Sequence, residues 1–196
     1  MKIEQGYYRQ EIVQDVAKDL LGKVLYTRIN NQVTAGVIVE TEAYSWRERG
    51  CHAYNNLRTA RTEVMFRTGG CAYVYLCYGI HNMFNVVTNI EGTAEAVLVR
   101  ALEPIEGVQI MQRRTGAQSL PRITSGPGKL SKAMAIERNL NGAFLWGNEI
   151  WIEDSGTEIA KNAVRAVSRV GIDYAGEDAT LPWRFIVADN PWISRS

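Results

Sequence analysis

Closely spaced strand-like segments constrain the fold of this chain more than any other feature. "KVLYTRI" (23–29) and "TAGVIVETEAY" (34–44) flank a turn that contains "NNQ", and the segment 71–89 is strand-like on both sides of Gly79. "EAVLVRAL" (95–102) follows as another strand. Short connections join antiparallel neighbours, whereas parallel strands need long crossovers. The sequence therefore predicts a mostly antiparallel sheet.

Helical spacing of apolar residues occurs in the intervening segments. Residues 9–22 repeat apolar side chains with helical spacing and end at Gly22, a residue suited to a C-terminal cap. A second helix is predicted around 104–114, and a third over 128–138 with Pro127 in its first turn. Together with the strands, these helices indicate a mixed α/β (α+β) fold with an antiparallel core and peripheral helices.

The length and composition indicate one domain over residues 1–196. An apolar fraction of 46% suffices for a hydrophobic core, and the net charge of +1 gives no global signature of nucleic-acid binding. Three cysteines without a CxxC pair fit a reducing compartment, and their spacing from the histidines does not match known zinc sites. The first residues lack the apolar run of a signal peptide, so we expect a cytoplasmic protein.

One strand carries two acidic side chains on the same face. Alternation along "VETEAY" places Glu40, Glu42 and Tyr44 together, although like charges two residues apart repel. The strand "VLVRAL" places Arg100 on the same face as two leucines, where a charge needs a partner. We expect Arg100 to pair with one of the two glutamates; strand parity does not decide which one.

The segment "YVYLCYGIHNMFN" concentrates aromatic side chains. At least one of Tyr73, Tyr75 and Tyr78 is expected in a packed aromatic core; Tyr78 precedes Gly79, and its side chain is expected to project from a turn. A tyrosine in that position has a flat apolar ring that can enter a base stack. Asn85 is a polar group in an apolar strand and needs hydrogen-bond partners, either as a structural amide or against a ligand.

Basic residues cluster locally on both sides of this aromatic segment. Residues 107–132 contain five basic side chains and no acid, and residues 47–67 contain five arginines against two glutamates. Such stretches are typical of a surface that contacts phosphates. Among them we select Arg58, Arg61 and Lys129 as candidate contacts to a DNA backbone.

The blocks "VIVETEAY", "YVYLCYGIHNMFNVV", "AVLVRALEPIEG", "SGPGKLSKAMAI" and "RVGIDYAGEDATLPWRF" span nearly the whole chain. In this order they closely resemble the alkyladenine (3-methyladenine or methylpurine) DNA glycosylase family. The resemblance implies base-excision repair of double-stranded DNA that contains damaged purines, by a monomer without metal or cofactor. It also implies a single mixed α/β domain with an antiparallel core, in agreement with the strand pattern.

The resemblance also implies catalytic roles, transferred position by position. The second glutamate of "ETEAY", Glu42, activates the attacking water, and Arg100 of "LVRALEP" supports it. The last tyrosine of "YVYxxYG", Tyr78, fills the space left by the extracted base. These roles describe hydrolysis of an N-glycosidic bond without lyase activity.

The remaining transferred residues form the base pocket. Tyr44 and His52 lie on opposite faces of the extracted base, Tyr75 completes the pocket, and Asn85 disfavours guanine by crowding its 2-amino group. Expected substrates are 3-methyladenine, 7-methylguanine, hypoxanthine and ethenoadenine. Two alternatives stay open: a carbohydrate glycosidase that uses Glu40 and Glu42, which lie roughly 7 Å apart on one strand, and a non-catalytic sensor of damaged bases.

Overall fold

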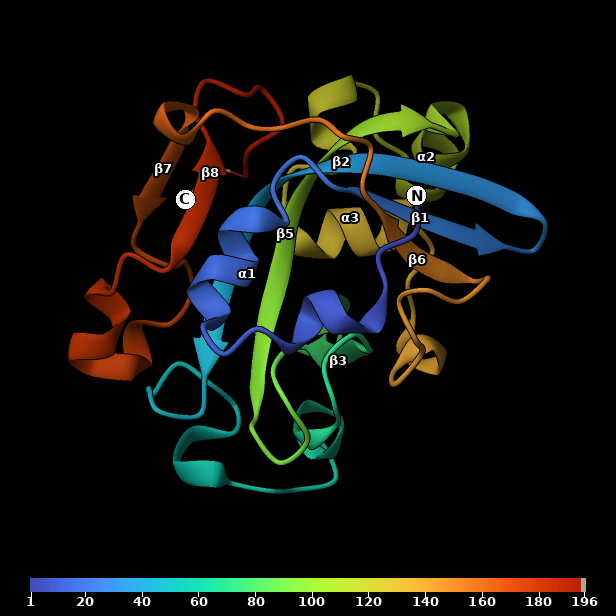
Figure 1. Cartoon of the computed structure of the whole chain (residues 1–196). Helices are drawn as coiled ribbons and strands as arrows, with labels where there is room; N and C mark the ends of the chain where they lie inside the picture. Colours follow the sequence, from blue (N-terminus) through green and yellow to red (C-terminus); the bar gives the residue numbers. More distant parts are fainter. Residues whose placement is uncertain (195–196) are drawn as a thin grey trace.

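The computed structural model describes residues 1–194 as one antiparallel sheet with helices around it (Figure 1). Over these residues the sheet has eight strands in the order β3-β4-β5-β2-β1-β6, and β8 pairs with both β2 and β7. The strands are β1 (Val24–Ile29), β2 (Gln32–Ser45), β3 (Ala72–Cys77), β4 (His81–Val87), β5 (Glu95–Glu106), β6 (Ile150–Glu153), β7 (Val164–Val167) and β8 (Arg184–Val187). Every pairing between these strands is antiparallel, which confirms the predicted fold class.

Three short α-helices and several 3-10 turns surround the sheet. The helices are α1 (Val13–Asp19), α2 (Val108–Thr115) and α3 (Pro127–Ala133). The 3-10 turns are η1 (Gln5–Arg9), η2 (Tyr54–Asn56), η3 (Glu63–Phe66), η4 (Leu120–Arg122), η5 (Arg138–Leu140), η6 (Lys161–Ala163) and η7 (Asp173–Thr180). Helix α1 packs on β2 and β5, and α3 packs on β4 and β5. None of the helices in residues 1–194 is long and apolar enough to cross a membrane.

The predicted first helix is shorter than expected, because tertiary contacts fix its beginning. The segment expected to be helical over 9–22 forms a helix only from Val13 to Asp19, after a separate 3-10 turn. Tyr8 is completely buried in that turn, and its carbonyl accepts a hydrogen bond from the backbone N–H of Asn89 at 2.8 Å. This contact holds the chain before Val13 outside the helix. Gly22, the predicted cap of the helix, has φ +86° but lies two residues beyond the C-cap residue Leu20, and its N–H donates to the carbonyl of Ile38 at 2.9 Å.

The other two helices differ from the prediction at one end each. Residues 104–106 continue β5 instead of starting a helix, and α2 begins only after Gly107, which has φ +68°. Helix α3 begins at Pro127 as predicted but ends at Ala133, not at 138. Its end is fixed by Ala135 at φ +52°, which turns the following Ile136 into the core.

Strand β2 changes partners along its length, and this change creates the environment of the two glutamates. Its first half pairs with β1, whereas Glu40 to Glu42 pair with β8 on one side and with β5 on the other. Two register shifts in the β2–β5 ladder lie next to Glu40. At the second shift Glu40 pairs with Ala101 and Thr41 pairs with Val99, so Arg100 is left between them without a partner in the ladder. Bulges reorient side chains in this way. Leu102 consequently packs in the core instead of sharing the face of Arg100, which corrects the simple alternation expected for this strand.

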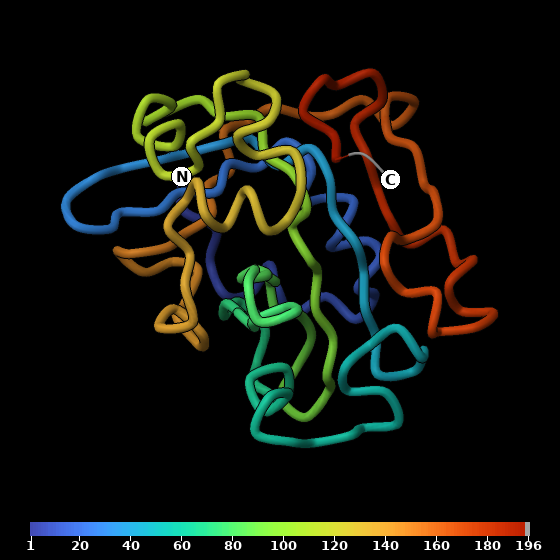
Figure 2. The backbone as a smooth tube through the Cα atoms, turned by 180° about the vertical axis from the view of Figure 1, so that it is seen from behind, coloured from blue at the N-terminus to red at the C-terminus, as the bar shows by residue number. Residues whose placement is uncertain are grey.

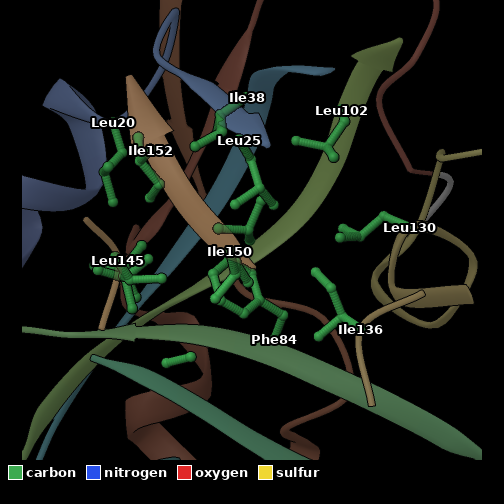
Figure 3. Packing of buried hydrophobic residues seen from close by; sticks show 14 of the residues in the cluster. Leu20, Leu25, Ile38, Phe84, Leu102, Leu130, Ile136, Leu145, Ile150 and Ile152 are labelled. Carbon is green, nitrogen blue, oxygen red and sulfur yellow. The ribbon is translucent and has the colours of Figure 1, made fainter. Parts of the chain in front are cut away.

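The hydrophobic core lies between the sheet and the three α-helices (Figure 3). Leu25, Ile38 and Leu102 of the sheet meet Leu130 of α3 there, all with no exposed surface. A second, smaller apolar cluster forms under the loop that precedes β3, around Met65 and Phe66 of η3. In Figure 2 the green β3–β4 hairpin lies between the yellow segment that contains α3 and this teal loop. The second cluster thereby supports the aromatic residues of β3.

Candidate active site

A buried arginine joins the two acidic side chains of β2. Arg100 contacts Glu40 through Nε at 3.0 Å and Glu42 through Nη1 at 3.3 Å. Both glutamates have no exposed surface, and Arg100 is only 6% exposed. The predicted ion pair is therefore present, and it involves both carboxylates instead of one. Arg184 of β8 adds a second guanidinium at 2.7 Å from Glu40, so two buried negative charges meet two positive ones.

The partners of Glu40 identify it as a structural residue. Its Oε1 accepts hydrogen bonds from Arg100, Arg184 and the hydroxyl of Ser194, and its Oε2 accepts the backbone N–H of Ser194 at 2.6 Å. Both carboxylate oxygens are thus occupied by donors from three different parts of the chain. A carboxylate held in this way ties the end of the described chain to the sheet.

Glu42 is held by groups that also line a cavity. Its Oε1 accepts the backbone N–H of Val170 at 2.8 Å, and its Oε2 accepts the hydroxyl of Tyr44 at 2.8 Å in addition to Arg100. Tyr44, Arg100 and Val170 all lie on the wall of one pocket. Burial, and secondly the charge of Glu42, raise the pKa of Tyr44 well above its ordinary value, so this tyrosine stays a hydrogen-bond donor. The Glu42 carboxylate therefore lies directly behind the pocket wall.

The pocket has a volume of about 470 Å³, and its lining includes five tyrosines. The lining includes four of the predicted base-binding residues together with the predicted wedge: Tyr44, His52, Tyr75, Asn85 and Tyr78. His52 packs edge-on against Tyr75, with ring centroids 4.6 Å apart. Tyr73 also lines this pocket, but it is only 2% exposed and belongs to the second apolar cluster, as expected for at least one tyrosine of this segment. The structure thus gathers residues from β2, the following loop, β3 and β4 around one cavity.

The hydrogen bonds of His52 define its protonation. Nε2 of His52 lies 3.2 Å from Nη2 of Arg61, and Nδ1 lies 3.0 Å from the hydroxyl of Tyr73. A guanidinium only donates, so Nε2 is the acceptor and Nδ1 carries the proton. Burial, and secondly the charge of Arg61, lower the pKa of His52 to about 4. His52 is therefore a neutral wall of the pocket at physiological pH.

Tyr78 protrudes from the turn between β3 and β4, as predicted. Its side chain is 90% exposed, and its backbone has φ +49°, a left-handed conformation that bulky residues rarely adopt. Gly79 follows at φ +73°, and the N–H of Ile80 closes the turn on the carbonyl of Cys77 at 3.1 Å. Backbone strain of this kind concentrates at functional sites. Ile80, 72% exposed, is a second apolar side chain at the tip.

Asn85 is fixed at the pocket wall by its neighbours in the sheet. It is 4% exposed, and its amide nitrogen donates to the carbonyl of Tyr73 at 3.0 Å and to that of Met83 at 3.5 Å. Asn85 therefore has hydrogen-bond partners in the sheet and also lines the pocket, so the two roles expected for it do not exclude each other. An amide held by two carbonyls cannot easily turn away from a bulky group in the cavity.

Comparison with known proteins identifies the family. The model of the family "Methylpurine-DNA glycosylase (MPG)" matches residues 7–191. The chain belongs to the methylpurine-DNA glycosylase family. Curated relatives with the printed name "Putative 3-methyladenine DNA glycosylase" include one from Natranaerobius thermophilus, 44% identical, which aligns over 99% of both chains. Another, from Methanocella arvoryzae, is 48% identical over 92% of this chain and 90% of the relative.

Three candidate phosphate contacts of this methylpurine-DNA glycosylase family member lie in different surroundings. Arg58 is exposed and forms a salt bridge with Glu63 at 2.6 Å. Lys129 is exposed on α3 and lines a groove of about 840 Å³ that shares Arg100 with the pocket. Arg61 is also exposed, but it lies on the pocket wall beside His52 and Tyr75.

Sequence reasoning missed one wall of the pocket of this family member. The segment from Val170 to Tyr174 closes the cavity, and Tyr174 donates a hydrogen bond to the carbonyl of Gly50 at 3.1 Å. Behind it, Arg169 forms a buried bidentate pair with Glu48, and its guanidinium lies 4.7 Å from the ring centroid of Tyr44. The block "RVGIDY" marked this segment as similar to the family, but no residue in it was assigned a role.

The three cysteines of this methylpurine-DNA glycosylase family member do not belong to a metal-binding cluster in the described part of the chain. All three are free, with Cys51 and Cys71 buried and Cys77 half-buried. Burial raises the pKa of the Cys51 thiol to about 12 and that of Cys71 to about 11. Across residues 1–194, no group of three or more histidine, cysteine or acidic side chains has the arrangement of a metal site. Cys51 and Cys71 pack in the second apolar cluster, whereas Cys77 lines the pocket.

Proposed function

We propose that the protein excises damaged purines from double-stranded DNA by flipping the nucleotide and hydrolysing the N-glycosidic bond with a water activated by Glu42. The observation that carries this proposal is a buried carboxylate held by Arg100 directly behind an aromatic pocket. The expected lesions are 3-methyladenine, 7-methylguanine, hypoxanthine and ethenoadenine. The protein acts as a monomer and without lyase activity.

Base flipping is supported by the turn between β3 and β4. The reacting sugar carbon is inaccessible in a duplex, so the nucleotide must rotate out at a cost of a few kcal/mol. Tyr78, exposed beside the pocket mouth, enters the vacated stack, while Tyr44, His52 and Tyr75 hold the extracted base. Each stacking contact returns roughly 1–3 kcal/mol. The aromatic groups therefore offset the cost of extraction.

The chemistry follows from the position of Glu42. Water that enters the pocket beside Val170 and Arg100 replaces one donor of the carboxylate and transfers a proton to it. The oxygen of this water bonds to C1′ of the sugar, and the electron pair of the broken bond leaves with the base. Until the proton has been transferred, the negative charge of Glu42 stabilises the oxocarbenium-like sugar, and Arg100 fixes the position of the carboxylate. A single displacement inverts the configuration at C1′.

A groove next to the pocket supports a path for the DNA backbone. The groove lining includes one basic side chain of η4, Arg122, and two of α3, Lys129 and Lys132. It continues to the pocket through shared residues, of which Arg100 and Pro127 are two. Cations along such a groove bind phosphates without regard to sequence. Lys129 in this groove and the exposed Arg58 outside it are the phosphate contacts we propose.

The two alternative functions fit the site less well. A carbohydrate glycosidase would need Glu40 as a second free carboxylate, but its oxygens are occupied by Arg100, Arg184 and Ser194. A non-catalytic sensor has no use for a carboxylate behind the pocket wall. The enzymatic proposal accounts for both glutamates.

A base-release assay, with a parallel incubation on oligosaccharides, separates these functions. Purified protein is mixed with DNA methylated by an alkylating agent, and the free purines are separated by chromatography. The proposal expects release of 3-methyladenine and 7-methylguanine, with strand breaks only after alkali. A protein that binds lesion DNA tightly but releases no base is a sensor, and one that cleaves only oligosaccharides is a carbohydrate glycosidase.

A further inference from the structure

We propose that Arg61 determines the charge class of the lesion: it promotes excision of neutral purines and opposes binding of cationic ones. The inference rests on the proposed function and extends it to a residue whose expected role was a phosphate contact. Neutral lesions, such as hypoxanthine, and cationic ones, such as 7-methylguanine, place opposite demands on the pocket. Arg61 lies where it can distinguish them.

The guanidinium of Arg61 is part of the pocket wall. It lies 3.2 Å from Nε2 of His52, and its central carbon lies 4.8 Å from the ring centroid of Tyr75. Both partners are residues that hold the base in the proposed mechanism. Since the face of Tyr75 already carries this cation, it attracts a positively charged purine less than a free tyrosine face would.

The positive charge of Arg61 has no acidic partner in the described chain. The other arginine of the pocket, Arg100, is balanced by Glu40 and Glu42. Arg61 forms no salt bridge with any carboxylate of residues 1–194, whereas Arg58, three positions earlier, pairs with Glu63. The pocket therefore contains one uncompensated positive charge.

His52, the neighbour of Arg61 on the pocket wall, cannot act as a general acid. Nε2 of His52 accepts from Arg61, and Nδ1 donates to the hydroxyl of Tyr73, so both ring nitrogens are engaged. A neutral imidazole bound on both sides cannot protonate a departing base. Stabilisation of a departing neutral lesion must then come from a fixed charge.

The two lesion classes differ in the charge that develops on the base. When the bond to C1′ breaks, the electron pair moves to the purine: a cationic 7-methylguanine leaves as a neutral molecule, whereas neutral hypoxanthine leaves as an anion that water later protonates. A guanidinium beside the base stabilises the anion, because preorganised donors act most strongly where charge develops. The same guanidinium repels the cationic lesion before the bond breaks. Arg61 therefore has opposite effects on the two classes.

The test measures single-turnover excision from two duplexes that differ only in the lesion, hypoxanthine or 7-methylguanine. Arg61→Gln is compared with Arg61→Lys, which keeps the charge, and with Arg58→Gln, which removes one charge from the same loop outside the pocket. Thermal unfolding and binding of lesion DNA are measured for each variant, so that a folding or docking defect is recognised.

We expect Arg61→Gln to slow hypoxanthine excision at least about tenfold and to leave 7-methylguanine excision unchanged or faster. Arg61→Lys restores most of the hypoxanthine rate, and Arg58→Gln leaves the ratio of the two rates unchanged. Equal loss on both lesions, no change on either, or a wild-type protein that excises 7-methylguanine but not hypoxanthine overturns the inference while the proposed function stands. A wild-type protein that releases no purine at all refutes the proposed function as well.

Discussion

The two glutamates of β2 differ in a way that one pair of substitutions can measure. They lie two residues apart on one strand and share Arg100, but Glu42 faces the pocket wall and Glu40 faces Arg184 and Ser194. Glu42→Gln and Glu40→Gln therefore remove the same charge at neighbouring places. The first should mainly affect excision, and the second should mainly affect stability.

The magnitude for Glu42→Gln follows from its three donors. The N–H groups of Val170 and Arg100 can only donate, so the new amide NH₂ finds an acceptor only in the hydroxyl of Tyr44. Losing one hydrogen bond between charged partners costs about 1.5–3 kcal/mol of unfolding free energy. Removing a general base slows the reaction roughly 10²–10⁴-fold. We expect lesion DNA to bind still, because the aromatic groups remain.

Glu40→Gln should show the reverse order of effects. The oxygens of Glu40 accept hydrogen bonds from two guanidinium groups and from the backbone N–H of Ser194. A glutamine at this position removes the negative charge that balances the positive charges of Arg100 and Arg184. Breaking a buried ion pair on one side costs about 3–5 kcal/mol. Excision by the fraction of molecules that stay folded should fall less than about tenfold, since the substitution leaves Glu42 unchanged.

Two measurements compare the variants at a temperature where both are folded. Urea unfolding gives the free energy of unfolding, and single-turnover excision of 7-methylguanine gives the rate of the chemical step. The reasoning is wrong if Glu42→Gln keeps substantial turnover. It is also wrong if folded Glu40→Gln protein loses as much activity as Glu42→Gln, which would be the outcome for a mechanism that needs both carboxylates.

Three further predictions address the pocket and the wedge. Tyr78→Ala should weaken binding and flipping of lesion DNA, because the wedge is lost, without moving the site of cleavage; undiminished flipping of a fluorescent base analogue would contradict the wedge. Asn85→Ser should raise excision of normal guanine, because the shorter side chain leaves room for the 2-amino group, and an unchanged guanine rate would mean that selectivity lies elsewhere. His52, whose pKa is lowered from 6.5 to about 4, should contribute up to about 3 kcal/mol of stability that is complete above pH 6.5 and is lost as the pH falls towards 4, because the unfolded chain binds the proton first. Urea unfolding at several pH values should therefore show a flatter profile for His52→Gln, and an unaltered profile would mean that His52 is not held neutral.

Much of the fold and part of the site could be predicted because they depend on local patterns. Strand alternation placed Glu40 and Glu42 on one face, and the glycine after Tyr78 marked the turn. An arginine in an apolar strand required a carboxylate, and Arg100 has two. These features follow from steric limits and from the cost of burying a charge, which act over a few residues. Helix ends were predicted less well, since the contact between Tyr8 and Asn89 and the positive φ of Ala135 leave little trace in periodicity.

Tertiary structure alone decided which glutamate faces the pocket. The donor that holds Glu42, the N–H of Val170, lies 128 residues further along the chain, and Ser194, which occupies Glu40, lies 154 residues away. A register shift in the β2–β5 ladder, where Arg100 is the extra residue of β5, places its guanidinium between the two carboxylates. Folding also places the exposed side chain of Arg61 beside His52 on the pocket wall, which the pattern of charges alone does not indicate. Sequence pattern determines which side chains share a face, because that depends on neighbouring residues; the chemistry of each depends on partners that only the folded chain brings together.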